Sequence, residues 1–447
     1  MILGQEPEGS ASSPDKAPVS TGQVASETAA TALRTPDPDE VGGPPAGNRF
    51  IAALWSANTV TVTVLSLFLA MVIGGVLICL SDPTVTAAYG YFFAAPGDAI
   101  AASWTAVSEA YANLFKGAIV DPAAVTGWLD GENTIWLALY PLSETLTYTA
   151  PLVFTGLAVA LAFRGGLFNI GAQGQAIIGA AVAGLVGFGL HLPPVVHLVF
   201  TLVAGAIGGA AYGFVPGFLK ARTGAHEVIT TIMLNYIALY FLSWLIVQDG
   251  VQDPNRTDAI SKPVDENALL PKLAGGDLRV HLGILLGVAA VVGVGWLLNR
   301  STFGFELRAV GLNPDAARTA GMSVAATYTG TMVIAGALAG LGGTTVLLGT
   351  AGALTGSVVG NIGFDGITVA LLGRGKPWGV LLAALLFGAL RAGGNRMQSF
   401  SGIPVDLVDV LTALIVLFIA APALVRSVFR LRAGRTGRLE TTVAKGW

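Results

Sequence analysis

The stretch ANTVTVTVLSLFLAMVIGGVLICL occupies residues 57–80 and contains no charged residue. A helix needs about 20 apolar residues to cross the hydrocarbon core of a membrane, so this stretch is long enough to span it. A signal peptide would place its apolar run closer to the N-terminus and end it at a small-residue cleavage site, and neither feature is present. The stretch therefore predicts a first transmembrane helix that is not cleaved.

Later stretches of similar character predict an all-α, polytopic transmembrane bundle of about ten spans. The composition agrees, because 53% of the residues are hydrophobic and 11% are charged, whereas a soluble chain carries about 25% charged residues. The eighth and ninth stretches are short and interrupted by Gly and Pro, so broken or re-entrant segments are expected there. The later spans are expected at roughly 142–163, 169–190, 195–219, 227–247, 280–298, 326–349, 357–373, 377–395 and 405–425.

Three regions divide the chain. Residues 1–50 are rich in Ala, Pro, Ser, Thr and Gly without an apolar period, which predicts a disordered tail. Residues 51–425 form the predicted membrane domain, and the basic segment 426–447 is expected to lie against anionic headgroups. Most of the 24 Lys and Arg residues fall in segments that ten spans place on the side of the N-terminus. The positive-inside rule then predicts that both termini are cytoplasmic.

The segment from Asp98 to Ile119 has apolar residues at helical spacing between the first two spans. This pattern suits a helix that lies on the membrane surface. It suits equally a helix that packs on the outer ends of the spans, and the sequence leaves both alternatives open.

The cytoplasmic loop 299–325 predicts a short helix with a defined start and end. Asn313 is a good N-cap, Pro314 fits the first turn, and Asp315 complements the helix dipole. Gly321 is placed to end the helix in a left-handed conformation. Such a helix suits a docking element, although an ordinary capped linker would look the same.

A short motif occurs twice. Asn-Ile-Gly-x-x-Gly occupies 169–174 and again 361–366, and each copy has an aromatic and a polar residue beside or within it. Glycine-interrupted apolar segments in corresponding places predict two pseudo-repeated halves with a substrate pathway between them. Close helix packing by the glycines, with the polar groups bonded between helices, is the structural alternative.

The sequence does not support an ion-driven carrier, an enzyme or a metal-binding protein. Asp365 is the only acid well inside a predicted span, whereas a proton- or sodium-driven carrier usually needs embedded acids. Asp406 and Asp409 are read as acids that complement the dipole of the last span. No phosphate-binding loop, nucleophile elbow or cluster of metal ligands is present, and the four histidines are scattered. The sequence therefore predicts no enzyme, no bound metal and no cofactor of its own.

Four strings then resemble a known family. LAFRGGLFNIGAQGQ, HEVITTIMLNYIALY, LRAVGLNPDAARTAGM and GFDGITVALLGRGKPWG occur in this order. They resemble the permeases of ATP-binding-cassette (ABC) importers in the branched-chain amino acid/ribose group, and most closely the nucleoside branch that works with basic-membrane-protein-type lipoproteins. The resemblance covers roughly residues 50–425.

The resemblance implies a permease subunit for nucleosides in the cytoplasmic membrane. Its partners would be an ABC ATPase that binds ATP and Mg, a second related permease and an external substrate-binding lipoprotein, with no nucleic acid. The resemblance also assigns ATPase coupling to Asn313, Asp315, Ala316, Arg318 and Gly321. A ribose or simple-sugar permease is the alternative, and a stand-alone secondary transporter is a further one.

The substrate pathway is predicted around the two motif copies. Phe168 and Phe364 could stack on a nucleobase. The polar candidates, which could bond ribose hydroxyls or base edges, are Asn169, Gln173, Gln175, Asn361 and Asp365.

Overall fold

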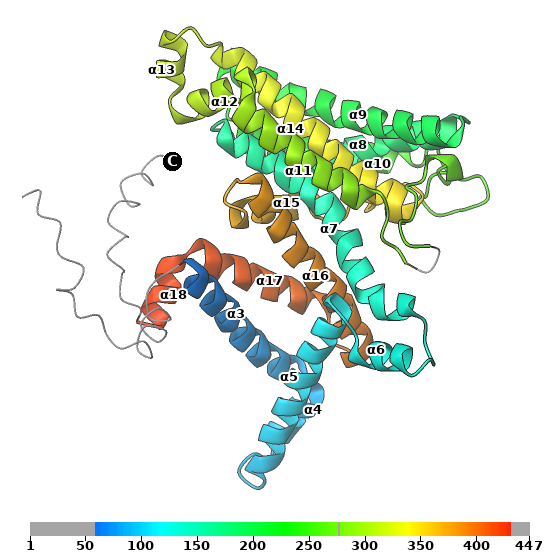
Figure 1. Ribbon diagram of the computed structural model, residues 1–447, viewed down its shortest axis with the longest axis vertical. Helices are drawn as coiled ribbons and strands as arrows, with labels where there is room; N and C mark the ends of the chain where they lie inside the picture. The colour runs from blue at the N-terminus through cyan, green and yellow to red at the C-terminus, as the bar shows by residue number, and fades with distance from the viewer. Residues whose placement is uncertain (1–58, 276–277, 431–447) are drawn as a thin grey trace, which may run out of the picture. The chain divides into compact units, whose positions relative to one another are not determined.

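The computed structural model describes residues 59–275 and 278–430, and over these residues it contains helices and no named strand (Figure 1). The expected disordered tail 1–50 and residues 431–447 of the basic segment 426–447 lie outside the described residues. The α-helices are α3 (Thr59–Ser81), α4 (Pro83–Tyr89), α5 (Pro96–Ala118), α6 (Pro122–Leu129), α7 (Ile135–Arg164), α8 (Ala172–Gly189), α9 (Pro194–Thr223), α10 (Glu227–Leu245), α11 (Gly283–Arg300), α12 (Thr302–Leu312), α13 (Pro314–Thr319), α14 (Val324–Val346), α15 (Ile362–Leu372), α16 (Pro377–Ser401), α17 (Val405–Ala420) and α18 (Pro422–Val428).

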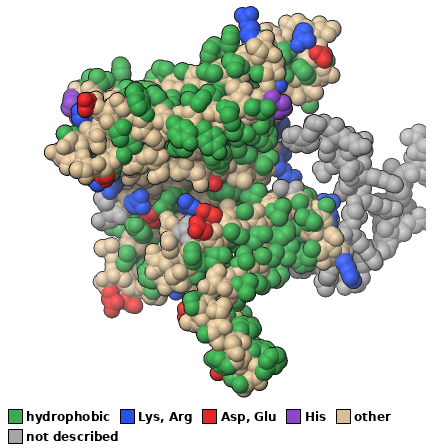
Figure 2. All heavy atoms as spheres, turned by 180° about the vertical axis from the view of Figure 1, so that it is seen from behind, with side chains coloured by type: hydrophobic (Ala, Val, Ile, Leu, Met, Phe, Trp, Pro, Cys, Tyr) green, Lys and Arg blue, Asp and Glu red, His purple; other side chains and the backbone are tan. Residues whose placement is uncertain are grey.

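The all-α membrane bundle is confirmed. Eight helices in the described part of the chain are long and apolar enough to span a membrane, and the pair α17–α18, bent by 88°, makes up to nine. Hydrophobic side chains are spread over the face seen in Figure 2, and charged side chains form only small groups on it. A surface of this kind suits lipid, because lipid cannot hydrate charge.

The eighth predicted span differs most from its expectation. Residues 357–361 form turns, and α15 that follows has only 11 residues, about half the length needed to cross a membrane. The break expected in this region is therefore present. The ninth predicted span, by contrast, is the continuous 25-residue helix α16.

Helix α7 forms the centre of the largest apolar core. Leu157 and Leu161 on α7 are fully buried among side chains of α14, α15 and α16. On the other side of α14, Gly209 of α9 and Gly336 of α14 face each other so closely that a Cβ on either would overlap the other's backbone. Small residues allow helix backbones in membranes to approach in this way, and here they fix α9 against α14.

The predicted helix at 98–119 is α5, and it packs against α16 and α3. Leu114 is buried in this contact, whereas Ile100, Trp104 and Phe115 are exposed. The apolar residues of α5 therefore do not share one buried face. The contacts of α5 with α16 and α3 agree with the second alternative, a helix that packs against the spans.

Candidate functional site

A cavity of about 400 Å³ lies among α7, α14, α15, α16, α17 and the segment before α11. Small-molecule sites commonly have volumes of about 300–1,000 Å³ and combine apolar walls with a few polar groups. Pro151, Leu152 and Phe387 supply apolar wall here. The polar and charged lining includes Thr147, Tyr148, Arg279, Asn361, Asp365, Arg391, Asp409 and Thr412.

One ion pair crosses the cavity wall from α16 to α17. Arg391 Nη1 lies 2.7 Å from Asp409 Oδ1. The interpretation of Asp409 as an acid that only complements the helix dipole was therefore incomplete, because its carboxylate pairs with a specific arginine. Asp406, in the first turn of the same helix, is exposed and does not line the cavity.

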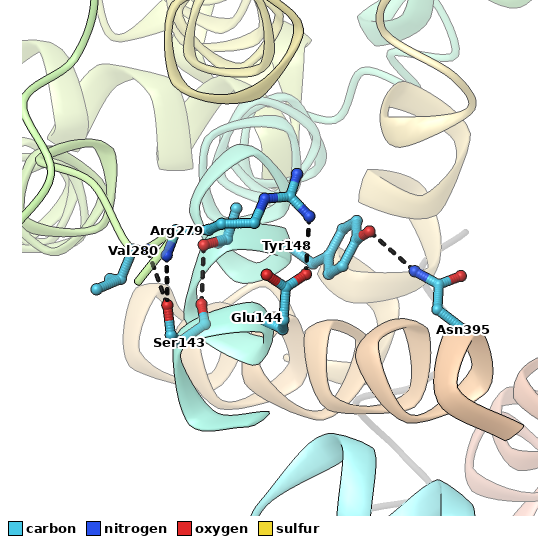
Figure 3. A network of polar contacts seen from close by, with 7 residues as sticks. Ser143, Glu144, Tyr148, Arg279, Val280 and Asn395 are labelled. Carbon is cyan, nitrogen blue, oxygen red and sulfur yellow. Dashed lines mark hydrogen bonds and ion pairs between the residues drawn. The ribbon is translucent and has the colours of Figure 1, made fainter. Parts of the chain in front are cut away.

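A polar network includes two of the cavity-lining residues, Tyr148 and Arg279 (Figure 3). Arg279 Nη1 lies 3.0 Å from Glu144 Oε2, and Asn395 Nδ2 donates to the Tyr148 hydroxyl at 2.8 Å. Ser143 Oγ accepts from the backbone amides of Arg279 and Val280, both at 2.9 Å. Tyr148 and Arg279 also line a second pocket of about 320 Å³. This network therefore joins α7, α16 and the segment before α11 in the wall between two hollows.

His281 is a buried polar group in the same wall. Its side chain is 1% exposed, and its Nδ1 accepts from the Gly283 amide at 3.1 Å. Because Nδ1 is an acceptor, the ring proton of a neutral imidazole lies on Nε2. No hydrogen-bond partner for Nε2 occurs among the described residues.

The first motif copy lies in the protein interior and away from the cavity lining. Asn169 Nδ2 donates to Gln175 Oε1 at 2.9 Å, and Gln175 Nε2 donates back to Asn169 Oδ1 at 3.2 Å. Asn235 of α10 holds the same loop by accepting from the Gly174 amide at 2.8 Å and donating to the Ile170 carbonyl at 3.0 Å. These polar groups satisfy one another, as buried polar groups generally must.

Gln173 joins the first copy to the second. Its Oε1 accepts from the Gly363 amide at 2.9 Å, and its Nε2 donates to the Gly360 carbonyl at 2.6 Å. Gly363 packs so closely on the Gln173 backbone that a Cβ there would overlap it. The two motif copies, distant in sequence, are thus in direct contact.

The seven residues predicted to form the substrate pathway therefore fall into two groups, those that line the cavity and those that do not. Asn361 and Asp365, both of the second copy, line the cavity. Asn169, Gln173 and Gln175 are buried and bonded within the protein. The aromatic pair also lies outside the cavity lining: Phe168 contacts the Phe163 ring at 5.1 Å between centroids, and Phe364 is 44% exposed.

Helix α13 has the predicted caps. Asn313 Oδ1 accepts from the amides of Asp315 and Ala316, both at 3.0 Å, and Gly321 has a φ of 85°. Ala317 is buried against α12 and α14 and anchors the helix. The five residues predicted to couple to an ATPase (Asn313, Asp315, Ala316, Arg318 and Gly321) are all exposed.

Some residues beside α13 and in the cavity lining were not predicted. Helix α12 was not expected, and its last residue, Leu312, is 88% exposed beside α13. Tyr148, Arg279, Phe387 and Arg391 also line the cavity. A basic residue such as Arg391 within an apolar segment was the available signal, because intramembrane charges mark functional sites.

The sequence also matches a known protein family. Residues 142–420 match the family described as branched-chain amino acid transport system / permease component. The chain belongs to this permease family.

Several curated ABC transporter permeases are similar in sequence to this permease. It is 42% identical over 321 residues to the guanosine ABC transporter permease protein NupP of Bacillus subtilis, covering 70% of this chain and 92% of the relative. It is 41% identical over 290 residues to the nucleoside ABC transporter permease protein NupB of Lactococcus lactis (62% and 79%). It is 35% identical over 309 residues to the glucose ABC transporter permease protein TsgB13 of Haloferax volcanii (67% and 80%). No solved structure matches the permease.

Proposed function

We propose that this permease forms the membrane pathway of an ABC importer for nucleosides. The observation that carries the proposal is the similarity to two relatives, named as guanosine and nucleoside permeases, at 41–42% identity. The cavity supports it, because about 400 Å³ with aromatic, hydroxyl and carboxylate lining suits a small molecule that has both an apolar base and a polar sugar.

The partners follow from the same proposal. A separate ABC ATPase binds ATP and Mg, a second related permease completes the membrane part, and an external lipoprotein delivers the substrate. The protein spans the plasma membrane many times with both termini in the cytoplasm, so that α13 faces the ATPase. No nucleic acid takes part.

Helix α13 supports the ATPase partner. It is only six residues long, it is capped by Asn313, and it is fixed to the bundle through the buried Ala317. Its exposed side presents the Asp315–Arg318 pair and lies beside the exposed Leu312. A rigid projection with an apolar residue and charges suits a groove on a partner protein, because preorganised contacts cost little ordering entropy.

Uptake into proteoliposomes tests the proposal. The complex of both permeases and the ATPase would be reconstituted with its binding protein, and uptake of radiolabelled guanosine, adenosine, cytidine and uridine would be measured with and without ATP inside. We expect ATP-dependent nucleoside uptake that excess unlabelled ribose or glucose does not compete. Glucose or ribose uptake without nucleoside uptake would refute the nucleoside assignment and favour the relation to the glucose permease.

The docking assignment has a separate test. Leu312→Ser and Arg318→Ala should each reduce the amount of ATPase that co-purifies with the permease, while nucleoside binding to the binding protein stays unchanged. Asp258→Asn, in the exposed loop between α10 and α11, is the control. Equal ATPase recovery in all three variants would place the docking surface elsewhere.

A further inference from the structure

Asp365 differs from the other charged residues of the cavity in having no partner of opposite charge bonded to it. Arg391 is bonded to Asp409 at 2.7 Å and Arg279 to Glu144 at 3.0 Å. The Asp365 carboxylate lines the same cavity, but no residue in the described part of the chain donates a hydrogen bond to it. The bonds of Asp365 are made by its backbone: its amide donates to the Asn361 carbonyl at 3.0 Å, and its carbonyl accepts from the Thr368 hydroxyl at 2.7 Å. Its two carboxylate oxygens are thus open to a ligand.

An open carboxylate in a cavity selects for hydrogen-bond donors. A ligand that displaces water from the cavity removes the hydration of this group, and a group left without a partner costs free energy. A ligand that donates to it restores the bond. A site built in this way discriminates against an analogue that lacks the donor, because that analogue leaves the polar group unsatisfied.

Two adjacent hydroxyls match the two carboxylate oxygens. Each hydroxyl can donate to one oxygen, and an acidic side chain holds ribose hydroxyls in the same manner in dinucleotide-binding folds. Apolar and aromatic wall for a base is available in the same cavity from Pro151, Tyr148 and Phe387. The cavity therefore offers complementary surfaces to both parts of a ribonucleoside.

A phosphate group would fit this cavity poorly. Both arginines in the lining already have an acidic partner. A phosphate would have to displace Asp409 or Glu144, and it would also lie in a cavity that contains the Asp365 carboxylate. Like charges at short range repel, so the lining favours an unphosphorylated ligand.

We propose that Asp365 binds the vicinal 2′- and 3′-hydroxyls of a ribonucleoside in the cavity and makes the permease itself select ribonucleosides over their deoxy analogues. This inference rests on the nucleoside function proposed above. It means that the permease, and not only the binding protein, contributes to the selection of the substrate.

The test compares ratios of uptake. Proteoliposomes with the complete complex would take up adenosine, 2′-deoxyadenosine or 3′-deoxyadenosine, with the same binding protein throughout. The variants are Asp365→Ala, Asp365→Asn and the control Asp406→Asn, an exposed acid of α17 outside the cavity lining. Because the binding protein is constant, a change in the ribo-to-deoxy ratio between variants reports the permease. Size-exclusion chromatography of each complex normalises uptake to folded protein.

We expect the ratio to fall about tenfold in Asp365→Ala, mainly through loss of adenosine uptake. The ratio for Asp365→Asn should lie between those of Asp365→Ala and the wild type, because an amide keeps only one acceptor oxygen. The ratio for Asp406→Asn should match the wild type. Adenosine uptake with an unchanged ratio in both Asp365 variants would overturn this inference and leave the nucleoside function standing. No nucleoside uptake by the wild type would overturn both.

Discussion

The two copies of Asn-Ile-Gly-x-x-Gly have the same pattern and different surroundings. In the first copy Asn169 bonds to Gln175 in the interior, and in the second copy Asn361 faces the cavity. At the fifth position the Gln173 side chain bonds to the backbone at the other copy, whereas the Asp365 carboxylate accepts from no donor among the described residues. The polar side chains of the first copy bond within the protein, and those of the second, Asn361 and Asp365, line the cavity.

This difference shows how polar residues can be divided within a membrane bundle. Polar groups that satisfy one another hold an irregular backbone in place, since unsatisfied groups in an apolar medium are costly. Polar groups left open must meet water or a ligand. Substitutions of the polar residues of the first copy should therefore lower stability, and substitutions of the cavity-lining residues of the second, Asn361 and Asp365, should alter transport.

The largest effect is expected where the two copies touch. Gly363→Ala places a Cβ within the backbone of Gln173, which cannot move aside as a side chain would. We expect a loss of about 3 kcal/mol or more in stability, at the upper end for overpacked sites. Thermal melting of the detergent-purified protein measures it. Gly356→Ala, where a Cβ meets nothing within 4 Å, is the matched control, and equal melting of the two variants would contradict the contact.

Gln173 should have the next largest effect. Gln173→Leu leaves the Gly363 amide and the Gly360 carbonyl without their partner, at a cost of about 1–3 kcal/mol. Gln173→Glu keeps the acceptor for Gly363 but loses the donor to Gly360, so its melting temperature should lie between those of Leu and the wild type. A Glu variant less stable than the Leu variant would contradict this order and show that a buried carboxylate facing the Gly360 carbonyl costs more than the acceptor for Gly363 contributes.

The reciprocal pair Asn169–Gln175 can be separated from its surroundings by a double-mutant cycle. Asn169→Leu and Gln175→Leu should each destabilise the protein, and the double variant should cost less than their sum, with a coupling of about 1 kcal/mol. Asp365→Asn, which breaks no bond from a protein donor to its carboxylate, should change stability by less than about 0.5 kcal/mol. Additive costs in the cycle would show that the two amides do not act as a pair.

Patterns along the chain were sufficient for most of the long apolar helices and for α13. The apolar stretches gave the spans, and Asn313 and Gly321 gave the ends of the short helix, because each of these signals is local. Which motif copy faces the cavity could not be predicted, because Asn169 and Asn361 occur in the same pattern. That choice depends on Asn235, Gln175 and Thr155, which reach the two loops from other positions or other helices. Arg391 and Asp409 likewise form a pair only through the packing of α16 and α17.

The smallest effect is expected for Phe364, although it lies inside the second copy. Its ring is 44% exposed and does not line the cavity, so Phe364→Leu removes aromatic surface that is partly exposed and outside the cavity lining. We expect a stability change within about 0.5 kcal/mol and nucleoside uptake close to that of the wild type. Asp365→Ala, one residue away, should alter the ribo-to-deoxy ratio in the same assay. If Phe364→Leu impaired adenosine and deoxyadenosine uptake together, the ring would act on a base common to both substrates. The cavity would then have to extend to the outer side of α15 in the transporting state, and the division between the two copies would apply to the resting structure alone.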